Sequence, residues 1–591
     1  MSHTPFARRS RAQTPSRIDC LRKRPLARAV AWAVLAALMA PSLPVFAAES
    51  VLSAPSAKAD ANATNAQAAT AAAAGGPVFS DGNGADGVAD AAAVFSVQLL
   101  GWRVESNDTK LLDAATGQWG AQEAKALSVD ANGRAEAQAF AVALQARALR
   151  AGFVSVHTIA DPTVGVIRLS LLPVHVTQSG RNNYIRYFSG LDGKSVSTHQ
   201  LEADTRLAQE AAAINGDHVA IALSNPTSSG ADTSGNSASV AGTDAGAAMP
   251  LTINSAAAEQ SKTYGGSLAF STYGQRYSSR DTLTESGYAR VADGLQADLS
   301  VTEGLPGLPP RGNDSSGGNF DAISAGLRDV TPWGIGSIRY SHTDYKQGGP
   351  DFRDFNINGT IDRVDTQFER PLSQNLSVFF GLSALTQRQS IGAADLDDRQ
   401  NLLFAQAGVN YQGAVGVSAR VMQGLAGADN YNLAPLAGPF DSHFTAFAID
   451  ASKSFQLAPR WSLDLAASAQ AGSQGTPSAM QFYLGGIGRG RAFTTGNLAG
   501  ADGAAASATV NYAVLPNWTI YGGLDGGFVK PAGVSTQNET SVFLGVKTAH
   551  AIRIGHTGAS ASLDVGVAQP LSKPAGESGG PTIGVFATIG F

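Results

Sequence analysis

Two groups of polar residues have side chains that could form a catalytic site or a metal site. Each group lacks other residues that such a site needs. A serine nucleophile in the run 314–318 would need a histidine and an acid, and no spacing assigns either of them to it. Asp395, Asp397 and Asp398 carry carboxylates that suit calcium, but a glycine and a distal glutamate at the spacing of a calcium-binding loop are missing. Both groups are better interpreted as solvated loops.

Cofactor signals are equally incomplete. Gly486, Gly488 and Gly490 are too regularly spaced for a dinucleotide-binding fingerprint, and no strand-to-helix unit surrounds them. The nine histidines show no metal-ligand spacing. These residues therefore predict neither a dinucleotide site nor a metal site.

The first 47 residues predict an export signal. Seven arginines and one lysine precede an apolar stretch from Ala29 to about Met39, and the signal ends near Ala47. That stretch is shorter than the ~20 residues that a spanning helix needs.

The single cysteine, Cys20, is removed with the signal peptide. Eight of the 42 basic and one of the 47 acidic residues are removed too, which leaves a net charge of −12 and argues against a nucleic-acid partner.

The C-terminal residues alternate as a strand with one face in lipid does. The apolar positions are Ile583, Val585, Ala587, Ile589 and Phe591. Similar segments recur from about Lys262 onward, which a soluble domain with one such edge strand would not show. At about twenty residues per strand and connection, this region holds about sixteen strands. We predict a transmembrane β-barrel of about 16 antiparallel strands over residues 259–591 in a bacterial outer membrane, with Phe591 as its assembly signal.

Residues 91–258 predict two small α+β modules in front of the barrel. The first, 91–175, has an apolar opening strand, a helix in which Phe140, Leu144 and Ala148 share a face, and two strands at 153–159 and 165–176.

The second module, 176–258, has a helix that begins at a capping box of Ser197 and Gln200. A Ser/Gly/Ala-rich insertion at 225–248 predicts a flexible loop. The alanine-rich stretch 48–90 predicts a linker.

Two small modules ahead of a sixteen-strand barrel resemble the two-partner secretion outer-membrane transporters (TpsB type). This family exports hemolysin- and filamentous-hemagglutinin-like exoproteins and belongs to the superfamily in which POTRA domains precede a barrel. The first module is similar to a POTRA domain over 149–153, 160–162 and 165–169, and the second over 174–176 with Gly180. The fold class that follows is a transmembrane β-barrel preceded by two POTRA-like periplasmic domains.

The most specific part of the resemblance is Leu484-Gly485-Gly486 followed by Gly490-Arg491-Ala492-Phe493. The family has a Leu-Gly-Gly and then a Val-Arg-Gly-aromatic tetrad on a long loop that folds back into the barrel lumen. The resemblance implies a lumen loop at about 485–502, with Leu484, Gly485 and Gly486 at its base and Gly490, Arg491 and Phe493 as the gate.

The tetrad departs from the family at two positions, where Gly490 replaces valine and Ala492 replaces glycine. A second register, with Arg489-Gly490 as the Arg-Gly pair, keeps the glycine but loses the aromatic. We prefer Arg491 because Phe493 then falls in place.

In the family the loop arginine pairs with an aspartate of a Phe-x-Asp-x-Gly motif on the inner wall. Residues 523–527 match the Asp-x-Gly at Asp525 but lack the aromatic. The alternation of this strand puts Thr519, Tyr521 and Asp525 in the lumen. The resemblance implies a salt bridge between Arg491 and Asp525, and the alternative is two separate pore-lining charges.

The resemblance implies that the barrel exports a secreted, TpsA-like exoprotein client, and that the protein is not an enzyme and uses no cofactor. The modules would capture it in the periplasm, through residues within 91–258 that the sequence does not identify. Other expected partners are outer-membrane lipid and the barrel assembly machinery. The alternatives are an assembly factor that inserts other barrels and, third, a diffusion porin.

Overall fold

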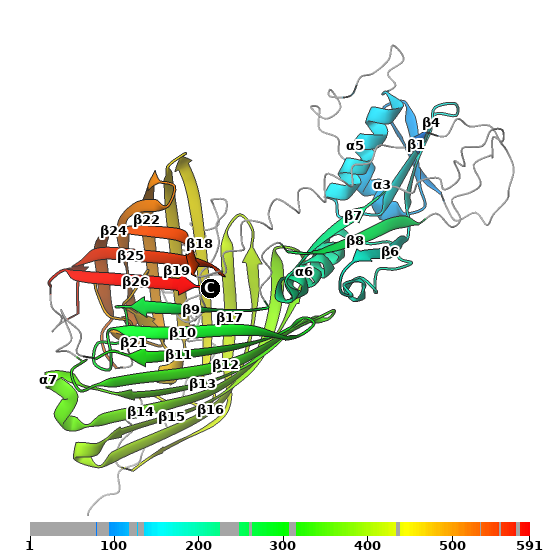
Figure 1. The fold of residues 1–591 in the computed structure, drawn as a ribbon. Helices are drawn as coiled ribbons and strands as arrows, with labels where there is room; N and C mark the ends of the chain where they lie inside the picture. The colour runs from blue at the N-terminus through cyan, green and yellow to red at the C-terminus, as the bar shows by residue number, and fades with distance from the viewer. Residues whose placement is uncertain are drawn as a thin grey trace, which may run out of the picture.

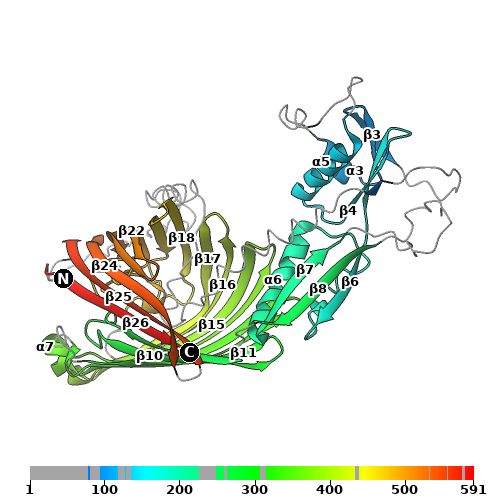
Figure 2. The same cartoon turned by 45° about the horizontal axis from the view of Figure 1, so that its top comes forward.

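The computed structural model describes residues 78–79, 94–117, 127, 135–224, 248–258, 263–306, 315–432, 438–531, 533–554, 557–574 and 579–591. The predicted signal peptide and nearly all of the predicted linker and insertion lie outside these residues. A large barrel occupies one end of the molecule, and two small modules extend in succession away from its rim (Figures 1 and 2).

Among its described residues, the first module has a five-stranded sheet and two helices. Phe140, Leu144 and Ala148, which were predicted to share a helix face, are fully buried in its core. Two residues of the predicted linker form β1, which pairs in parallel with β4. The sheet order is β1-β4-β5-β3-β2. The elements are β1 (Val78–Phe79), β2 (Phe95–Leu99), β3 (Trp102–Ser106), α3 (Thr109–Thr116), α5 (Ala137–Arg150), β4 (Val156–Asp161) and β5 (Val166–Leu171).

The second module is a three-stranded sheet, in the order β6-β8-β7, with a long helix. Its helix α6 starts where the Ser197 hydroxyl accepts a hydrogen bond from the Gln200 amide at 3.3 Å, and it ends at Gly216, whose φ is 72°. None of the described helices is long and apolar enough to cross a membrane. The elements are β6 (Val174–Gly180), η1 (Ile185–Tyr187), α6 (Thr198–Asn215), β7 (Asp217–Leu223) and β8 (Met249–Ala257).

The prediction of one strand over 165–176 is wrong. That stretch holds two strands, because β5 ends at Leu171 and β6 begins at Val174 in the other sheet. Pro173 lies between them and has no amide to donate to a ladder, so the chain leaves the first sheet there.

Sixteen antiparallel strands among the described residues close into the barrel, which confirms the predicted fold class. The wall follows chain order from β10 to β19, then β22 to β26, and β9 closes it. Short helical turns α7 (Gly349–Phe352), η3 (Arg353–Phe355) and η4 (Gly392–Ala394) lie between strands. The strands are β9 (Tyr264–Ser271), β10 (Thr282–Ala292), β11 (Leu295–Gly304), β12 (Asn319–Thr331), β13 (Gly334–Lys346), β14 (Ile357–Pro371), β15 (Leu376–Ile391), β16 (Leu396–Gln412), β17 (Gly416–Tyr431), β18 (Thr445–Ala458), β19 (Trp461–Gly472), β22 (Asp502–Leu515), β23 (Trp518–Lys530), β24 (Gln537–Ile554), β25 (Thr557–Ser572) and β26 (Thr582–Gly590).

The closing seam between β26 and β9 is short. Its register pairs five positions, from Phe586 with Ser271 to Gly590 with Ser267, whereas β14 and β15 pair fifteen. Phe591 extends the seam by exchanging two backbone hydrogen bonds with Gly266, at 2.9 and 3.0 Å. The C-terminal residue is therefore part of barrel closure.

Helix α6 and the segment before it attach the second module to one end of the barrel. We call this end the module end. Arg206 pairs with Glu369 at 3.0 Å, and the Tyr187 hydroxyl donates to the Val330 carbonyl at 2.8 Å. Val330, near the end of β12, and Ile335, near the start of β13, join the hydrophobic core of the module. This shared core fixes the orientation of the module on the barrel.

Candidate functional site

The connection between β19 and β22 leaves the barrel wall and forms a hairpin against its inner face. Strands β20 (Phe482–Leu484) and β21 (Leu498–Gly500) pair with each other, after a short turn η5 (Ser478–Met480). Phe482 and Leu484 are buried against Ala505 of β22 and Val529 of β23. The hairpin tip, 485–497, is thereby held inside the lumen.

Glycines at the base of the tip are required by its geometry. Gly485 and Gly486 have φ angles of 91° and 84°, which side-chain-bearing residues rarely adopt. A Cβ on Gly485 would lie 1.9 Å from the Thr494 carbonyl oxygen. The Gly485 and Gly486 amides donate to the Arg489 and Phe493 carbonyls at 2.9 and 3.0 Å, which closes the tip on itself.

Asp525 accepts two backbone amides of the tip and is one of several acceptors that hold the tip to the wall. It is 3% exposed, and its carboxylate accepts the amides of Gly488 at 3.1 Å and Arg491 at 3.0 Å, together with the hydroxyl of Ser541 on β24. The ion pair implied between the Arg491 guanidinium and Asp525 is not formed among the described residues. The structure joins the two residues through the backbone of Arg491 instead.

The Arg491 side chain lies on aromatic rings. Its Nη1 donates to the Tyr521 hydroxyl at 2.9 Å, and its guanidinium carbon lies 4.2 Å from the centre of the Phe543 ring. The Tyr521 hydroxyl donates in turn to Asp564 on β25. A buried guanidinium is thus stabilised by ring faces and a tyrosine-to-carboxylate relay.

Phe543 takes the place of the aromatic residue that the Phe-x-Asp-x-Gly motif lacks in this chain. Gly523 occupies the position where the family has phenylalanine, and it lies directly opposite Phe543 in the β23–β24 ladder. A Cβ on Gly523 would come within 3.0 Å of the Phe543 ring. The ring from the neighbouring strand therefore fills the space, and it also packs with Phe493 and Ala492 of the tip.

Arg489, the alternative motif arginine, has a different environment. It lies 3.8 Å from the Asp450 carboxylate on β18 and stacks over the Phe482 ring at 4.6 Å. Only the Arg491 register brings an amide, a guanidinium and an aromatic side chain to the wall around Asp525. Arg489 therefore contacts the wall at β18, whereas Arg491 contacts it at β23 and β24.

The loop also bridges the closing seam. Thr582 of β26 donates to the Ala492 carbonyl at 2.8 Å, and Thr495 of the tip donates to the carbonyl of Tyr273, just after β9, at 2.6 Å. Both sides of the shortest ladder in the wall are thus connected to one loop. A change in the loop can reach the seam directly.

Sequence reasoning placed Tyr521 in the lumen but missed Ser541, Phe543 and Asp564. The signal available was the alternation of β24 and β25, in which these residues take the inward phase.

The described residues contain no group of three or more His, Cys, Asp or Glu side chains that could hold a metal ion. Asp314 lies outside the described residues, and Ser315 is buried.

Residues 330–548 match the family model of the haemolysin secretion/activation proteins ShlB/FhaC/HecB. The matched segment contains the lumen hairpin, Asp525 and Phe543. No curated protein sequence matches the chain.

Solved structures that share the fold include two CdiB proteins. CdiB from Escherichia coli aligns with a TM-score of 0.59 at 14% identity, over 90% of this chain and 97% of that one. CdiB from Acinetobacter baumannii aligns with a TM-score of 0.56, at the same identity and coverage. Both alignments extend over the modules as well as the barrel.

Proposed function

We propose that this chain, a two-partner secretion outer-membrane transporter of the ShlB/FhaC/HecB haemolysin secretion/activation family, exports a large exoprotein from the periplasm to the cell surface. The observation that carries this function is the match of residues 330–548 to that family. The barrel lies in the outer membrane, and the modules at its rim are POTRA-like domains in the periplasm. Transport by this route needs no catalysis and no cofactor.

The function is tested by deleting the gene for this chain in its host. We expect one large exoprotein to disappear from the medium while other outer-membrane barrels still assemble, because those barrels depend on a separate assembly machinery. Immunoblots of the medium and of isolated outer membranes measure both. Normal exoprotein release would overturn the proposal, and loss of other barrels would favour the assembly-factor alternative.

The loop around Arg491 is proposed as the gate. The hairpin occupies part of the lumen and thereby narrows the path for a polypeptide, so its role as a gate would be to move or to set a conformation that opens the path. Its attachment to Asp525, to the rings of Tyr521 and Phe543 and to both seam strands supports this role.

Client capture is proposed at the β2 edge of the first module's sheet, beyond which no further strand pairs among the described residues. β2 is the last strand of its sheet, and its side chains Phe95 and Val97 are 41% and 37% exposed. At the opposite edge, β4 is already paired with β1. An extended client segment can add to β2 through main-chain hydrogen bonds, with Phe95 and Val97 offering apolar contacts.

Changing Phe95 and Val97 together to serine is expected to weaken client binding at least ten-fold. Both side chains are exposed, so module stability should change little. Binding of a purified N-terminal client fragment to the full-length protein in detergent measures the effect. Val164→Ser, on a 65% exposed turn of the same module, is the matched control. Equal affinities for all three proteins would place capture elsewhere in residues 91–258.

A further inference from the structure

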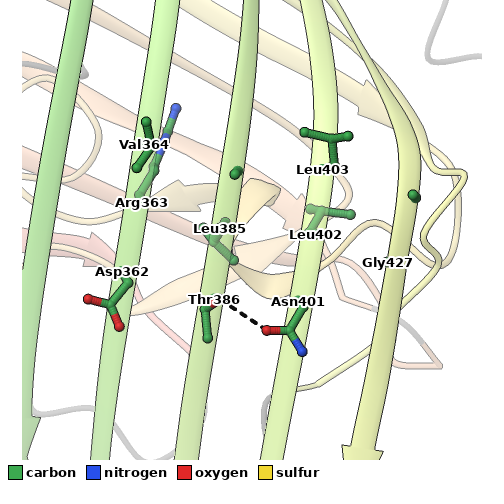
Figure 3. Close-up of a pocket in the computed structure, with 11 residues that line it drawn as sticks. Asp362, Arg363, Val364, Leu385, Thr386, Asn401, Leu402, Leu403 and Gly427 are labelled. Carbon is green, nitrogen blue, oxygen red and sulfur yellow. Dashed lines mark hydrogen bonds between the residues drawn. The ribbon is translucent and has the colours of Figure 1, made fainter.

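An open hollow of about 370 Å³ lies on the barrel wall across four neighbouring strands (Figure 3). Its lining residues come in short runs, at 362–364 of β14, 384–386 of β15, 401–403 of β16 and 426–427 of β17. The floor is therefore the sheet itself, where small residues leave the backbone uncovered: Ala384, Ala426 and Gly427.

The hollow faces lipid and not the lumen. In each run of three, the flanking side chains point outward, as the 39% and 41% exposure of Val364 and Leu403 shows, and the middle residue points inward. Leu385 and Leu402, both middle residues, are buried in a cluster inside the barrel. A concavity in the lipid-facing belt must be filled by hydrocarbon, because an empty space forfeits dispersion contacts.

A polar collar lines the hollow on the side away from the modules. Thr386 donates to Asn401 at 3.0 Å across the β15–β16 ladder. Next to them, the Asp362 carboxylate is bonded to the His342 ring nitrogen at 2.8 Å and accepts from the Tyr340 hydroxyl at 3.0 Å. Because the modules mark the periplasmic end, this collar lies at the outer leaflet. Its mixed donors and acceptors suit a ligand with hydroxyl and amide groups.

Two arginines lie next to the collar on the barrel wall, farther from the modules than the collar is. Arg388 of β15 and Arg399 of β16 are directly opposite each other in the ladder. Both are exposed and outward-facing, since their neighbours Gln387 and Gln400 bond to Ser478 and Gly438 on the lumen side. Neither guanidinium forms an ion pair or hydrogen bond with another described residue. Like charges directly opposite each other destabilise a sheet. The charge of the Asp362 carboxylate acts on Arg388 and offsets part of this repulsion, and an anion between the two guanidiniums would offset the rest.

We infer that this surface binds a phosphorylated glycolipid of the outer leaflet. One acyl chain fills the hollow, sugar hydroxyls and amides meet Thr386, Asn401 and Asp362, and a phosphate bridges Arg388 and Arg399. The inference rests on the apolar hollow, the polar collar and the cation pair in that order along the membrane normal. A ligand with only a phosphate or only an acyl chain would use one part of this surface.

The test measures lipid binding by the full-length protein, purified in detergent, with native mass spectrometry. Lipid A, dephosphorylated lipid A and phosphatidylglycerol serve as probes. We expect lipid A to bind at least ten-fold more tightly than either of the others. The double variant Arg388→Gln/Arg399→Gln should lose that preference, because the phosphate site is gone. Lys573→Gln, just after β25 on the opposite wall, is the matched control and should bind as the parent protein does.

A second variant tests the hollow. Ala384→Phe should reduce lipid A binding at least ten-fold with both arginines intact, because the ring occupies the acyl position. The heat-dependent shift of the folded barrel on gels verifies that each variant is folded. Unchanged lipid A binding in either the double variant or Ala384→Phe overturns the inference, as does phosphatidylglycerol binding as tight as lipid A.

Discussion

Replacing Asp525 with alanine is expected to lower exoprotein export at least ten-fold while the barrel stays folded. Asp525 accepts two amides of the loop tip and the Ser541 hydroxyl in a site that is almost closed to solvent. Its removal leaves these donors unsatisfied, and each buried unsatisfied group costs about 1–3 kcal/mol. Since 1.4 kcal/mol is a factor of ten, the loss of two such bonds shifts the tip at least ten-fold toward detachment. The contacts of Arg491, Thr495 and Thr582 then hold the tip without this anchor.

Exoprotein in the medium and barrel level in the membrane together measure this effect. The matched control is Asp298→Ala, because Asp298 pairs with Arg339 at 3.0 Å on strands β11 and β13, away from the loop. Normal export by Asp525→Ala would show that tip attachment is not required. Reduced export by both variants to the same degree would point to a general effect of lumen charge.

Variants of Arg491 and Arg489 extend the same export experiment to the side chains of the loop. Arg491→Ala removes the contacts with Tyr521 and Phe543 but keeps the amide that Asp525 accepts, so its effect should be smaller than that of Asp525→Ala. Arg491→Lys should not restore export fully, because an ammonium lacks the planar face that stacks on Phe543. If Arg489→Ala is more damaging than Arg491→Ala, the motif arginine is Arg489.

The barrel could be predicted because its pattern is local. Alternating apolar residues mark each lipid-facing strand, and even strand number and spacing follow from closure. The alternation of β23 also gave the inward phase of Tyr521 and Asp525, which are both 3% exposed. The strand break at Pro173 was missed because apolar residues continue on both sides of it.

The site could be predicted only as far as residue types reveal it. The Arg491–Asp525 contact uses a backbone amide, which every non-proline residue carries, so no side-chain pattern specifies it. Phe543 lies twenty positions from Gly523 in sequence, and only the β23–β24 register brings them face to face. Register depends on the whole ladder, which a motif does not contain.

The second large effect is expected at the junction of module and barrel. Asp204 of α6 is 5% exposed, and Arg370 of β14 lies 3.6 Å away and also donates to the Pro332 carbonyl. Burial raises the pKa of Asp204 from 3.8 to about 6, even though Arg370 acts to lower it. The folded state therefore holds this proton more tightly than the unfolded state does. The stabilisation is fully present below pH about 3.8 and is lost as pH rises through about 6.

Asp204→Asn is accordingly expected to stabilise the second module at pH 7.5. A pKa shift of roughly two units corresponds to about 3 kcal/mol, and asparagine avoids this cost because it stays neutral while keeping the shape of the side chain. Hydrogen exchange of the α6 amides at pH 5 and 7.5, corrected for intrinsic rates, should show greater protection in the variant at pH 7.5 and a weaker pH dependence.

A matched variant on the same helix separates the effect of burying a carboxylate from the effect of removing a charge. Glu210 is 35% exposed at its ion pair with Arg328, so Glu210→Gln should change protection little. Lower protection of Asp204→Asn at pH 7.5 would mean that attraction to Arg370 outweighs the burial of the carboxylate. In that case the ionised Asp204 stabilises the docked module at neutral pH, and acid would loosen the junction instead of tightening it.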